Sequence, residues 1–528
     1  MSDTGKTKPG LIETLLTKYR GTFATLVLIP ISFWYEAYLK ISRKISFWLN
    51  TAPKKHGKRV ENVRKQLEAW KKDGCPEKLT TGRSGWFAMS EVIPSYKKTN
   101  RKIFLNMRDI LEINEEKETV RVEPQVTMGQ ITAALNPRGW TIAVLPELDD
   151  LTVGGLVNGF GIETSSHKYG LFQFICESFE IITPDGDVKT CSKEENPELF
   201  SMIPWSYGTF GFLTAVELKM VPAKKYVRLK YIPITSQEEL LQRFDEESNK
   251  ENPHDFVEAI VYSHEKSVLL LGDQVDKKGN DGPKNAIRRW YKTWFYKHIE
   301  HILNEGKEKI EYIPLRQYYH RHTRSLFWMM DHVIPFGNHP LHRFFFGWAM
   351  PPQLSLMKYF ETQTTRELRE KFAVTQDMLV PMSKLKASLD HFHDNFNLYP
   401  LWLCPMAVYD QPNGLGMLHA HKKEDGTVEE MFVDIGAYGI GTTPDFDGIE
   451  ALKKCEKFVI ENDGYQAMYA KTMLSEEDFR RMFDHSYYDI LRDKIPNARK
   501  AFPDVYHKLS SKARIAPSEF KKMKKKKI

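Results

Sequence analysis

The feature of this sequence that most restricts its fold is a glycine-rich segment, residues 146–172. Glycine accepts positive φ angles and lets backbone N–H groups approach an anionic ligand closely, and side-chain hydroxyls add neutral donors. The segment therefore predicts a backbone loop that wraps a phosphate-bearing cofactor, and a purely structural glycine-rich turn is the alternative. It has neither a complete GxGxxG nor a Walker A lysine. Its glycines are residues 154, 155, 159, 161 and 170, and its hydroxyl side chains include Thr152, Ser165 and Ser166.

Short β-type runs surround this segment between residues 79 and 222, separated by Gly, Pro and Asp. They predict strands at 103–106, 119–122 and 179–183, and a helix at 125–136. A second region starts at residue 224. There we expect strands at 226–234, 398–404 and 430–435 and helices at 236–244 and 449–462. Short strands mixed with helices favour an α+β fold over a doubly wound parallel sheet.

The N-terminus contains an apolar run of nineteen residues, 21–39, interrupted only by Pro30 and Glu36. This length is close to the roughly 20 residues that cross a bilayer as a helix. The run therefore predicts a single membrane anchor helix, and an interfacial amphipathic helix is the alternative. A cleaved signal peptide is disfavoured because bulky residues end the run. More basic residues follow the run than precede it, which places the C-terminal body in the cytosol.

The net charge of +7 comes largely from the two ends of the chain, so the body is close to neutral and a nucleic-acid partner is not expected. The five cysteines are scattered without metal-ligand spacing, so no metal site is predicted. The last four residues, 525–528, resemble a dilysine signal for the endoplasmic reticulum. A solvated polybasic tail is the alternative.

The order of motifs between residues 79 and 222 resembles the FAD-binding domain of the vanillyl-alcohol oxidase / p-cresol methylhydroxylase superfamily. The matching elements are a phosphate-loop candidate at 81–84, a strand unit at 105–113, a "V-x-V-x-P-G-V" unit at 120–135 with Gln125 in place of the glycine, "T-V-G-G" at 152–155, "S-S-x-x-Y-G" at 165–170, "P-D-G-x-V" at 184–188, "N-P-E-L-F" at 196–200 and "G-x-x-G-F-L-T" at 208–214.

This resemblance implies FAD contacts from the phosphate loop, the glycine-rich segment and the last motif. Residues 82–87 contain neither His nor Cys, so the FAD is expected to be non-covalent. His167 is the histidine expected nearest the flavin, with a packing role as the alternative. The residues implied to bind the cofactor are Thr81, Gly82, Arg83, Ser84, Asp150, Thr152, Val153, Gly154, Gly155, Asn158, Gly159, Gly161, Ile162, Ser165, Ser166, His167, Gly208 and Gly211.

A closer resemblance is to the Δ24-sterol reductase family. It rests on ELDDLTVGGL, SSHKYGLFQ, EYIPLRQYYHRHTRS, IPFGN, QDMLVP, YPLWLCP and DIGAYG, and covers nearly the whole chain after the anchor. It implies reduction of the sterol side-chain double bond with NADPH and FAD at the endoplasmic reticulum membrane. The implied architecture is an N-terminal segment (1–20), a membrane anchor helix (21–40), a two-part FAD-binding domain (55–223), an α+β substrate or cap domain (224–515) and a basic tail (516–528).

An isolated alkene needs both a hydride and a proton for its reduction, so a protein acid is expected. The densest supply of donors is the cluster Tyr318, Tyr319, His320 and His322. Arg316, Arg321 and Arg324 are candidates for the extra phosphate of NADPH, since arginine binds phosphate in bidentate fashion. Core packing is the alternative for this cluster. For the aromatic block 326–352 core packing is the prediction, and an apolar tunnel or a lip that dips into the membrane is the alternative.

Glu147, Asp149 and Asp150 precede the glycines and are expected to cap the loop by hydrogen bonds. Three functional alternatives remain: an oxidase acting on a sugar lactone or alditol, an isomerase of the sterol side chain, and a sterol-binding protein without catalysis.

Overall fold

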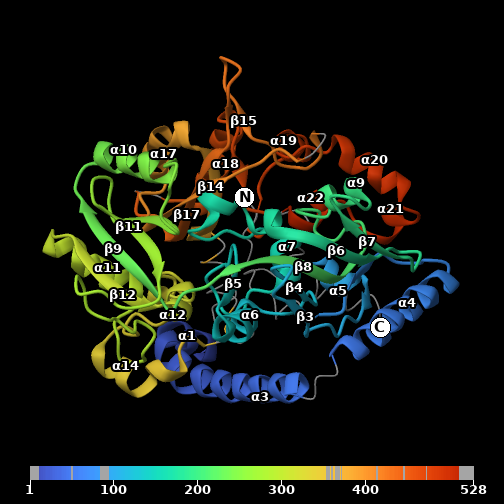
Figure 1. Cartoon of the computed structure of the whole chain (residues 1–528), viewed down its shortest axis with the longest axis horizontal. Helices are drawn as coiled ribbons and strands as arrows, with labels where there is room; N and C mark the ends of the chain where they lie inside the picture. Colours follow the sequence, from blue (N-terminus) through green and yellow to red (C-terminus); the bar gives the residue numbers. More distant parts are fainter. Residues whose placement is uncertain are drawn as a thin grey trace.

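The computed structural model describes residues 11–48, 52–83, 94–352, 357, 361–362, 369, 371–411, 414–443, 446–470 and 472–510. Two large antiparallel sheets form the body, and helices pack around them (Figure 1). Their antiparallel pairing confirms the predicted α+β class, because a doubly wound fold would have a parallel sheet.

The first sheet has the strand order β3-β4-β8-β6-β7, and β5 also pairs with β8. The long strand β8 connects the two sheets, since the chain passes from its end directly into β9 of the second sheet. A short parallel pair, β1 and β2, lies apart from this sheet. The bounds are β1 (Leu79–Thr81), β2 (Arg101–Ile103), β3 (Ile110–Asn114), β4 (Thr119–Val122), β5 (Trp140–Ile142), β6 (Cys176–Ile182), β7 (Val188–Ser192) and β8 (Phe212–Pro222).

The second sheet has eight strands in the order β12-β9-β11-β10-β14-β17-β13-β18. Every residue of β10 and β14 is buried, so these central strands are covered on both faces. The bounds are β9 (Tyr226–Ile234), β10 (Phe256–Val261), β11 (Ser267–Val275), β12 (Lys309–Pro314), β13 (Ala373–Pro381), β14 (Leu401–Ala407), β17 (Met431–Ile440) and β18 (Tyr465–Gln466).

Helix boundaries follow local capping signals. Helix α6 (Met128–Leu135) begins with a capping box between Thr127 and Gln130. The side chain of Asp447 accepts the first N–H groups of α18 (Gly448–Glu461). These helices and α10 (Gln237–Ser248) lie within four residues of their predicted bounds, and β9 coincides with its prediction. The strand predicted at 103–106 is instead β2, which ends at residue 103.

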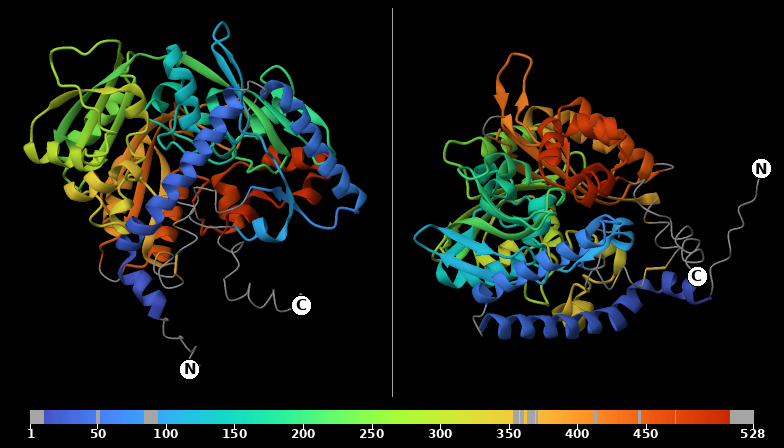
Figure 2. Two further views of the ribbon diagram at one scale, coloured as in Figure 1. Left: turned by 90° about the horizontal axis from the view of Figure 1, so that it is seen from below. Right: turned by 90° about the vertical axis from the view of Figure 1, so that its right-hand side faces the viewer.

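After α1 (Leu11–Lys18), the N-terminal apolar run lies in consecutive helical segments, α2 (Arg20–Phe23), a π-helical turn (Ala24–Leu28) and α3 (Ile29–Trp48). Figures 1 and 2 show α3 lying along one outer edge of the body. One side of these segments is buried, including Gly21, Ala24, Thr25, Leu28, Ile29 and Ser32. Within the described part of the chain, no helix is both long and apolar enough to cross a membrane, so the predicted spanning helix is unconfirmed.

The C-terminal helices return to the first sheet. Ala501 and Phe502 pack in one apolar cluster with Val63, Leu67 and Trp70 of α4 (Ala52–Lys72). The division predicted at residue 224 coincides with the step from β8 to β9, but these helices belong in space to the first domain. Their bounds are α19 (Glu476–Met482), α20 (Ser486–Lys494), α21 (Ala498–Ala501) and α22 (Val505–Leu509).

A buried ion cluster joins the glycine-rich segment to the second sheet. The Arg321 guanidinium donates to both carboxylate oxygens of Glu258 on β10 and to Glu163, each at 2.9 Å. All three side chains are fully buried. Burial opposes ionisation, but the charge of Arg321 and a contact to His322 lower the pKa of Glu258 to about 2. Glu258 therefore stays ionised beside Arg321, whereas burial raises the pKa of Glu163.

Replacing Arg321 by Met should destabilise the fold strongly, because two carboxylates would remain buried without their cation. Loss of one partner of a buried ion pair costs about 3–5 kcal/mol. Arg228→Met is the matched control, since Arg228 pairs with Asp281 at a partly exposed site and such pairs contribute about 0–1 kcal/mol. Urea unfolding followed by tryptophan fluorescence measures both, and equal losses would contradict the role assigned to the buried cluster.

Candidate active site

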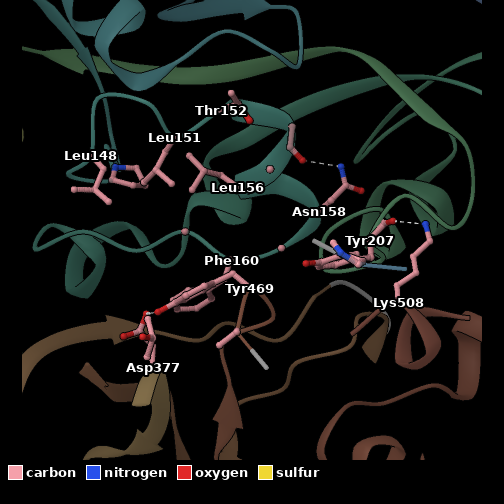
Figure 3. Close-up of a pocket in the computed structure, with 18 of the residues that line it drawn as sticks. Leu148, Leu151, Thr152, Leu156, Asn158, Phe160, Tyr207, Asp377, Tyr469 and Lys508 are labelled. Carbon is pink, nitrogen blue, oxygen red and sulfur yellow. Dashed lines mark hydrogen bonds between the residues drawn. The ribbon is translucent and has the colours of Figure 1, made fainter. Parts of the chain in front are cut away.

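A cavity of about 520 Å³ lies between the glycine-rich segment of the first domain and strands β13 and β17 of the second sheet. Figure 3 shows the glycine-rich segment on one side and Asp377 and Tyr469 on the other. Helix α22 closes a further side with Lys508. The cavity is thus assembled from three parts of the chain that are distant in sequence.

The glycine-rich wall is built on the short helix α7 (Val153–Asn158). The Asn158 amide donates to the carbonyl of Gly154 at 2.8 Å, and the Gly154 N–H donates to Pro124 at 2.8 Å. A Cβ on Gly154 would lie 2.8 Å from Pro124, and one on Gly161 would lie 2.7 Å from Phe172. These glycines let the backbone pack closely against the domain behind it while it faces the cavity.

Many predicted cofactor residues line this cavity. They are Thr81, Arg83, Asp150, Thr152, Gly154, Gly155, Asn158, Gly159, Gly161, Ile162, Gly208 and Gly211. Ser84 lies outside the described residues. Of the predicted residues that are described, Gly82, Val153, Ser165, Ser166 and His167 are not among those that line it.

The second half of the segment packs the two domains together. The Ser165 hydroxyl donates to Ala143 at 2.9 Å, and the His167 Nε2 lies 2.9 Å from the carbonyl of His254. Burial lowers the pKa of His167 to about 4, so this histidine is neutral. The geometry thus favours the packing alternative for His167.

One end of the cavity is cationic. Arg83, Lys97 and Lys508 line it together with Tyr96 and Tyr207. The ammonium of Lys508 donates to the carbonyl of Tyr207 at 2.8 Å, and the guanidinium of Arg83 donates to Thr152 at 3.3 Å. Burial and neighbouring cations lower the pKa of Lys97 to about 8, and burial lowers that of Lys508 as well. A bound anion would offset this concentration of positive charge.

Only Arg83 of these three cations was predicted from the sequence. Lys97 begins an ordinary polar stretch, residues 97–102, and Lys508 lies in the last described helix, more than 300 residues from the glycines. Only the tertiary fold brings them together.

The opposite end of the cavity holds a carboxylate bonded to two tyrosines. The Tyr469 hydroxyl donates to Asp377 Oδ2 at 2.7 Å, and the Tyr438 hydroxyl donates to Oδ1. Burial raises the pKa of Asp377 to about 6 and that of the nearby Glu147 to about 8. Asp434, also buried, has its pKa raised well above the usual range by burial and by these carboxyls. No role for Asp377, Tyr438 or Tyr469 was predicted from the sequence.

The acids predicted from the sequence lie elsewhere. Tyr318, Tyr319, His320 and His322 are all buried, and the residues that line the cavity do not include them. The Tyr318 hydroxyl lies 3.2 Å from Thr164, and His320 Nε2 lies 2.9 Å from Thr132. Burial lowers the pKa of both histidines to about 4. The geometry favours a packing role for this cluster.

Two of the three arginines predicted to bind the extra phosphate of NADPH are hydrogen-bonded to other groups inside the protein. Arg321 belongs to the buried ion cluster, and Arg324 donates to main-chain carbonyls of Arg289, Trp290 and Lys292 at 2.8–3.1 Å. Arg316 is half exposed near Asp149. A contact of these arginines with NADPH stays a prediction.

The cavity fits an FAD on its own chemistry. It offers phosphate-binding cations at one end, backbone glycines along one wall and apolar side chains toward Asp377. Gln376 lines the cavity and is buried, and its side-chain amide has no hydrogen-bond partner among the described residues. Buried amides are normally paired, so this group suits a polar atom of a ligand.

Comparisons with known proteins agree with this geometry. A family model described as an FAD binding domain matches residues 60–192. The Delta(24)-sterol reductase of Homo sapiens is 44% identical over 503 residues, which cover 95% of this chain and 96% of that protein. The Delta(24)-sterol reductase homolog of Caenorhabditis elegans is 39% identical over 516 residues, covering 95% and 97%. The Delta(24)-sterol reductase of Arabidopsis thaliana is 37% identical over 530 residues, covering 95% and 93%.

The position of Lys97 predicts that FAD binds more weakly at alkaline pH. Above about pH 8 the ammonium of the free protein loses its proton. A phosphate favours the charged form, so binding must then take up a proton and the affinity falls by up to about tenfold per pH unit. Fluorescence titration of the FAD-free protein between pH 6 and 10 measures this effect.

The variant Lys97→Met should weaken FAD binding at pH 7 by about tenfold or more, since a charged hydrogen bond contributes about 1.5–3 kcal/mol. It should also make the alkaline decline shallower. The adjacent, exposed Lys98 gives the control variant Lys98→Met. If both variants bind FAD as the unaltered protein does, Lys97 does not contact the phosphates.

Proposed function

The chain belongs to the Delta(24)-sterol reductase family, and we propose that it reduces the Δ24 side-chain double bond of a sterol, with NADPH as the source of electrons. The observation that carries the proposal is the cavity. It has a cationic, glycine-walled part that suits FAD and an apolar part with proton-donating groups that suits an alkene.

The cations Arg83, Lys97 and Lys508 would hold the FAD phosphates, and the glycines from Gly154 to Gly161 would pack against the cofactor. Bound and reduced, FAD supplies a hydride. The chain itself has to hold the alkene, exclude water and provide the proton that completes the reduction.

The apolar part of the cavity suits a sterol side chain. It is lined by Phe160, Leu326, Phe327, Met329 and Trp402. Sugar lactones and alditols are polar and would leave hydroxyl groups unpaired against these side chains. This lining therefore favours a sterol over the substrates of a sugar oxidase.

We further propose that the protein attaches to the endoplasmic reticulum membrane through its N-terminal helices, with its body facing the cytosol. The support is an exposed apolar stripe on α3, formed by Ile31, Trp34, Tyr38, Ile41 and Ile45. Their spacing of three and four residues puts them on one side of the helix. Trp34 is 72% exposed and Tyr38 is 68% exposed.

A second apolar surface adjoins this stripe. The exposed side chains of helix α14 (Pro340–Phe346) and the turn after it are Leu341, Phe344, Phe345 and Trp348. The Trp348 ring packs on Phe33 of α3 with centroids 4.7 Å apart. Exposed apolar side chains on adjacent helices are typical of surfaces that insert into the membrane interface. This surface contains part of the aromatic block 326–352, for which a membrane lip was an alternative to core packing.

The reductase proposal predicts two spectral changes. Under anaerobic conditions NADPH should bleach the flavin absorbance of the purified protein. Desmosterol, a Δ24 sterol, should restore the absorbance, with formation of the sterol whose side chain is saturated. Stopped-flow absorbance and mass spectrometry of the sterol follow the two steps. A protein that carries no flavin would contradict the proposal, as would bleaching by a sugar substrate alone.

The membrane proposal predicts that the protein floats with liposomes containing anionic lipids and that the double variant Trp34→Asp/Ile41→Asp does not. The control, Val188→Asp/Val428→Asp, changes two exposed apolar residues away from the stripe and should still float. Alkaline carbonate extraction then separates the two forms of attachment, because a spanning helix stays in the membrane and an interfacial helix is released. Equal flotation of both double variants would contradict a role for the stripe.

A further inference from the structure

The group formed by Asp377, Tyr438 and Tyr469 identifies a proton donor for the proposed reaction. We propose that Tyr469 protonates the sterol double bond and that Asp377 positions Tyr469 and supplies it with the proton. This inference rests on the proposed reductase function.

Tyr469 is the member of the group best placed to meet a substrate. It lines the cavity and is partly exposed there, whereas Tyr438 is 5% exposed. The loop that carries Tyr469 follows β18, and the N–H of Ala467 in this loop donates to the carbonyl of Asp377 at 3.0 Å. The backbone therefore fixes Tyr469 against Asp377 independently of their side-chain bond.

A glycine makes room for the group. Gly436 on β17 lies opposite Asp377 in the pairing of β13 with β17. A Cβ at this position would lie 2.6 Å from the Tyr438 hydroxyl and 3.0 Å from Asp377 Oδ1. The missing side chain thus lets the hydroxyl of Tyr438 reach the carboxyl group.

The environment of Asp377 favours its neutral form. Burial raises its pKa to about 6, and the buried carboxyls Glu147 and Asp434 lie close enough to interact with each other and with Asp377. Adjacent buried carboxyls cannot all ionise. Arg321 and Glu163 also act on Glu147, but with opposite signs, and the pKa of Glu147 stays raised to about 8. The group can therefore store a proton near neutral pH.

Protonation of Asp377 reverses one hydrogen bond. An ionised carboxylate only accepts, whereas a carboxylic acid has one O–H donor. Tyr438 donates to Oδ1, so the proton belongs on Oδ2, the oxygen 2.7 Å from Tyr469. Oδ2–H then donates to the Tyr469 oxygen, and the hydroxyl hydrogen of Tyr469 is released from Asp377 to face the cavity.

A proton from Tyr469 and a hydride from the cofactor together reduce the double bond. The π electron pair of the alkene takes the Tyr469 proton and forms one C–H bond, and Tyr469 takes the proton of Asp377 in the same step. The other alkene carbon forms its C–H bond with a hydride from the reduced flavin, which is oxidised. Asp377 is left as a carboxylate and recovers a proton from water after the product leaves.

Aromatic rings at this end of the cavity suit the positive charge that develops on a protonated alkene. Phe327 packs on Trp402 and Tyr438, with ring centroids 5.3 Å and 4.9 Å away. All three rings line the cavity. The faces of such rings attract cations, most strongly where water is excluded.

The test follows a single turnover of the purified FAD-loaded protein, reduced anaerobically and mixed with desmosterol. Tyr469→Phe removes the hydroxyl and keeps the ring. It should slow the sterol-dependent reoxidation of the flavin by about 10²–10⁴-fold, the usual contribution of general acid catalysis. Flavin content, melting temperature, flavin reduction by NADPH and binding of desmosterol to the oxidised protein should stay unchanged.

Tyr231→Phe is the matched control, because Tyr231 is also buried and donates to a carboxylate, Glu311, at 3.1 Å, but lies in β9 away from the cavity. Reoxidation of Tyr469→Phe within threefold of this control would overturn the proposal. If NADPH does not reduce the flavin, reduction by dithionite still allows the sterol step to be measured. If sterol does not reoxidise the unaltered protein, the proposed function fails and the donor assignment fails with it.

The dependence on pH tests Asp377 without relying on a variant at Tyr469. The reoxidation rate of the unaltered protein should fall as pH rises above about 6, because Asp377 then loses its proton. In Asp377→Asn the reoxidation of the flavin should be slow, and its rate should no longer depend on pH. At pH 5 the infrared spectrum of the unaltered protein minus that of Asp377→Asn should contain the carbonyl band of one protonated acid, Asp377. A rate that does not change between pH 5 and 9 would overturn the relay.

Discussion

The buried ion cluster around Arg321 is the interaction on which the site depends. Its guanidinium holds Glu163, at the end of the glycine-rich wall, and Glu258, in the middle of the second sheet. The indole of Trp402, which lines the cavity, also donates to Glu258 at 2.8 Å. A buried ion pair is costly and is tolerated when its groups are well hydrogen-bonded, as both oxygens of Glu258 are. The cluster therefore fixes the distance between the two cavity walls, since neither carboxylate can move away without losing its cation.

The sequence predicted the parts of the fold and site whose chemistry is contained in one short segment. The glycines of residues 146–172 predict a cofactor wall from local chemistry alone, and the spacing of apolar residues placed helix α6 within a few residues of its bounds. The carboxyl end of the cavity is different. Asp377 and Tyr469 are 92 residues apart and meet only because the loop after β18 is held against β13. No local pattern indicates such a pairing.

The proton donors predicted at residues 318–322 show the opposite limit of sequence-based prediction. Residues 318–322 contain many polar groups in a short stretch, but density along the chain does not show which groups reach a cavity. Here the stretch lies between the domains, and its polar atoms are used to join them, as in the bond of Arg321 to Glu163. The N-terminal run shows a similar limit. Hydropathy sums both sides of a helix, whereas Leu28 is buried against the body and Trp34 is exposed.

Without a ligand, both ends of the cavity hold ionisable groups in an unfavourable environment. One end concentrates positive charge, and the other buries carboxyl groups. At one end, burial and mutual repulsion lower the pKa of Lys97 and Lys508; at the other, burial raises those of Asp377 and Glu147. An anion stabilises the first end, whereas an apolar group leaves the neutral acids of the second end undisturbed. The charge distribution therefore favours one orientation of an FAD, with its phosphates near Lys97. The same burial that makes the lysines receptive to phosphate raises the pKa of Asp377 to about 6, so cofactor binding and proton donation have a common physical origin.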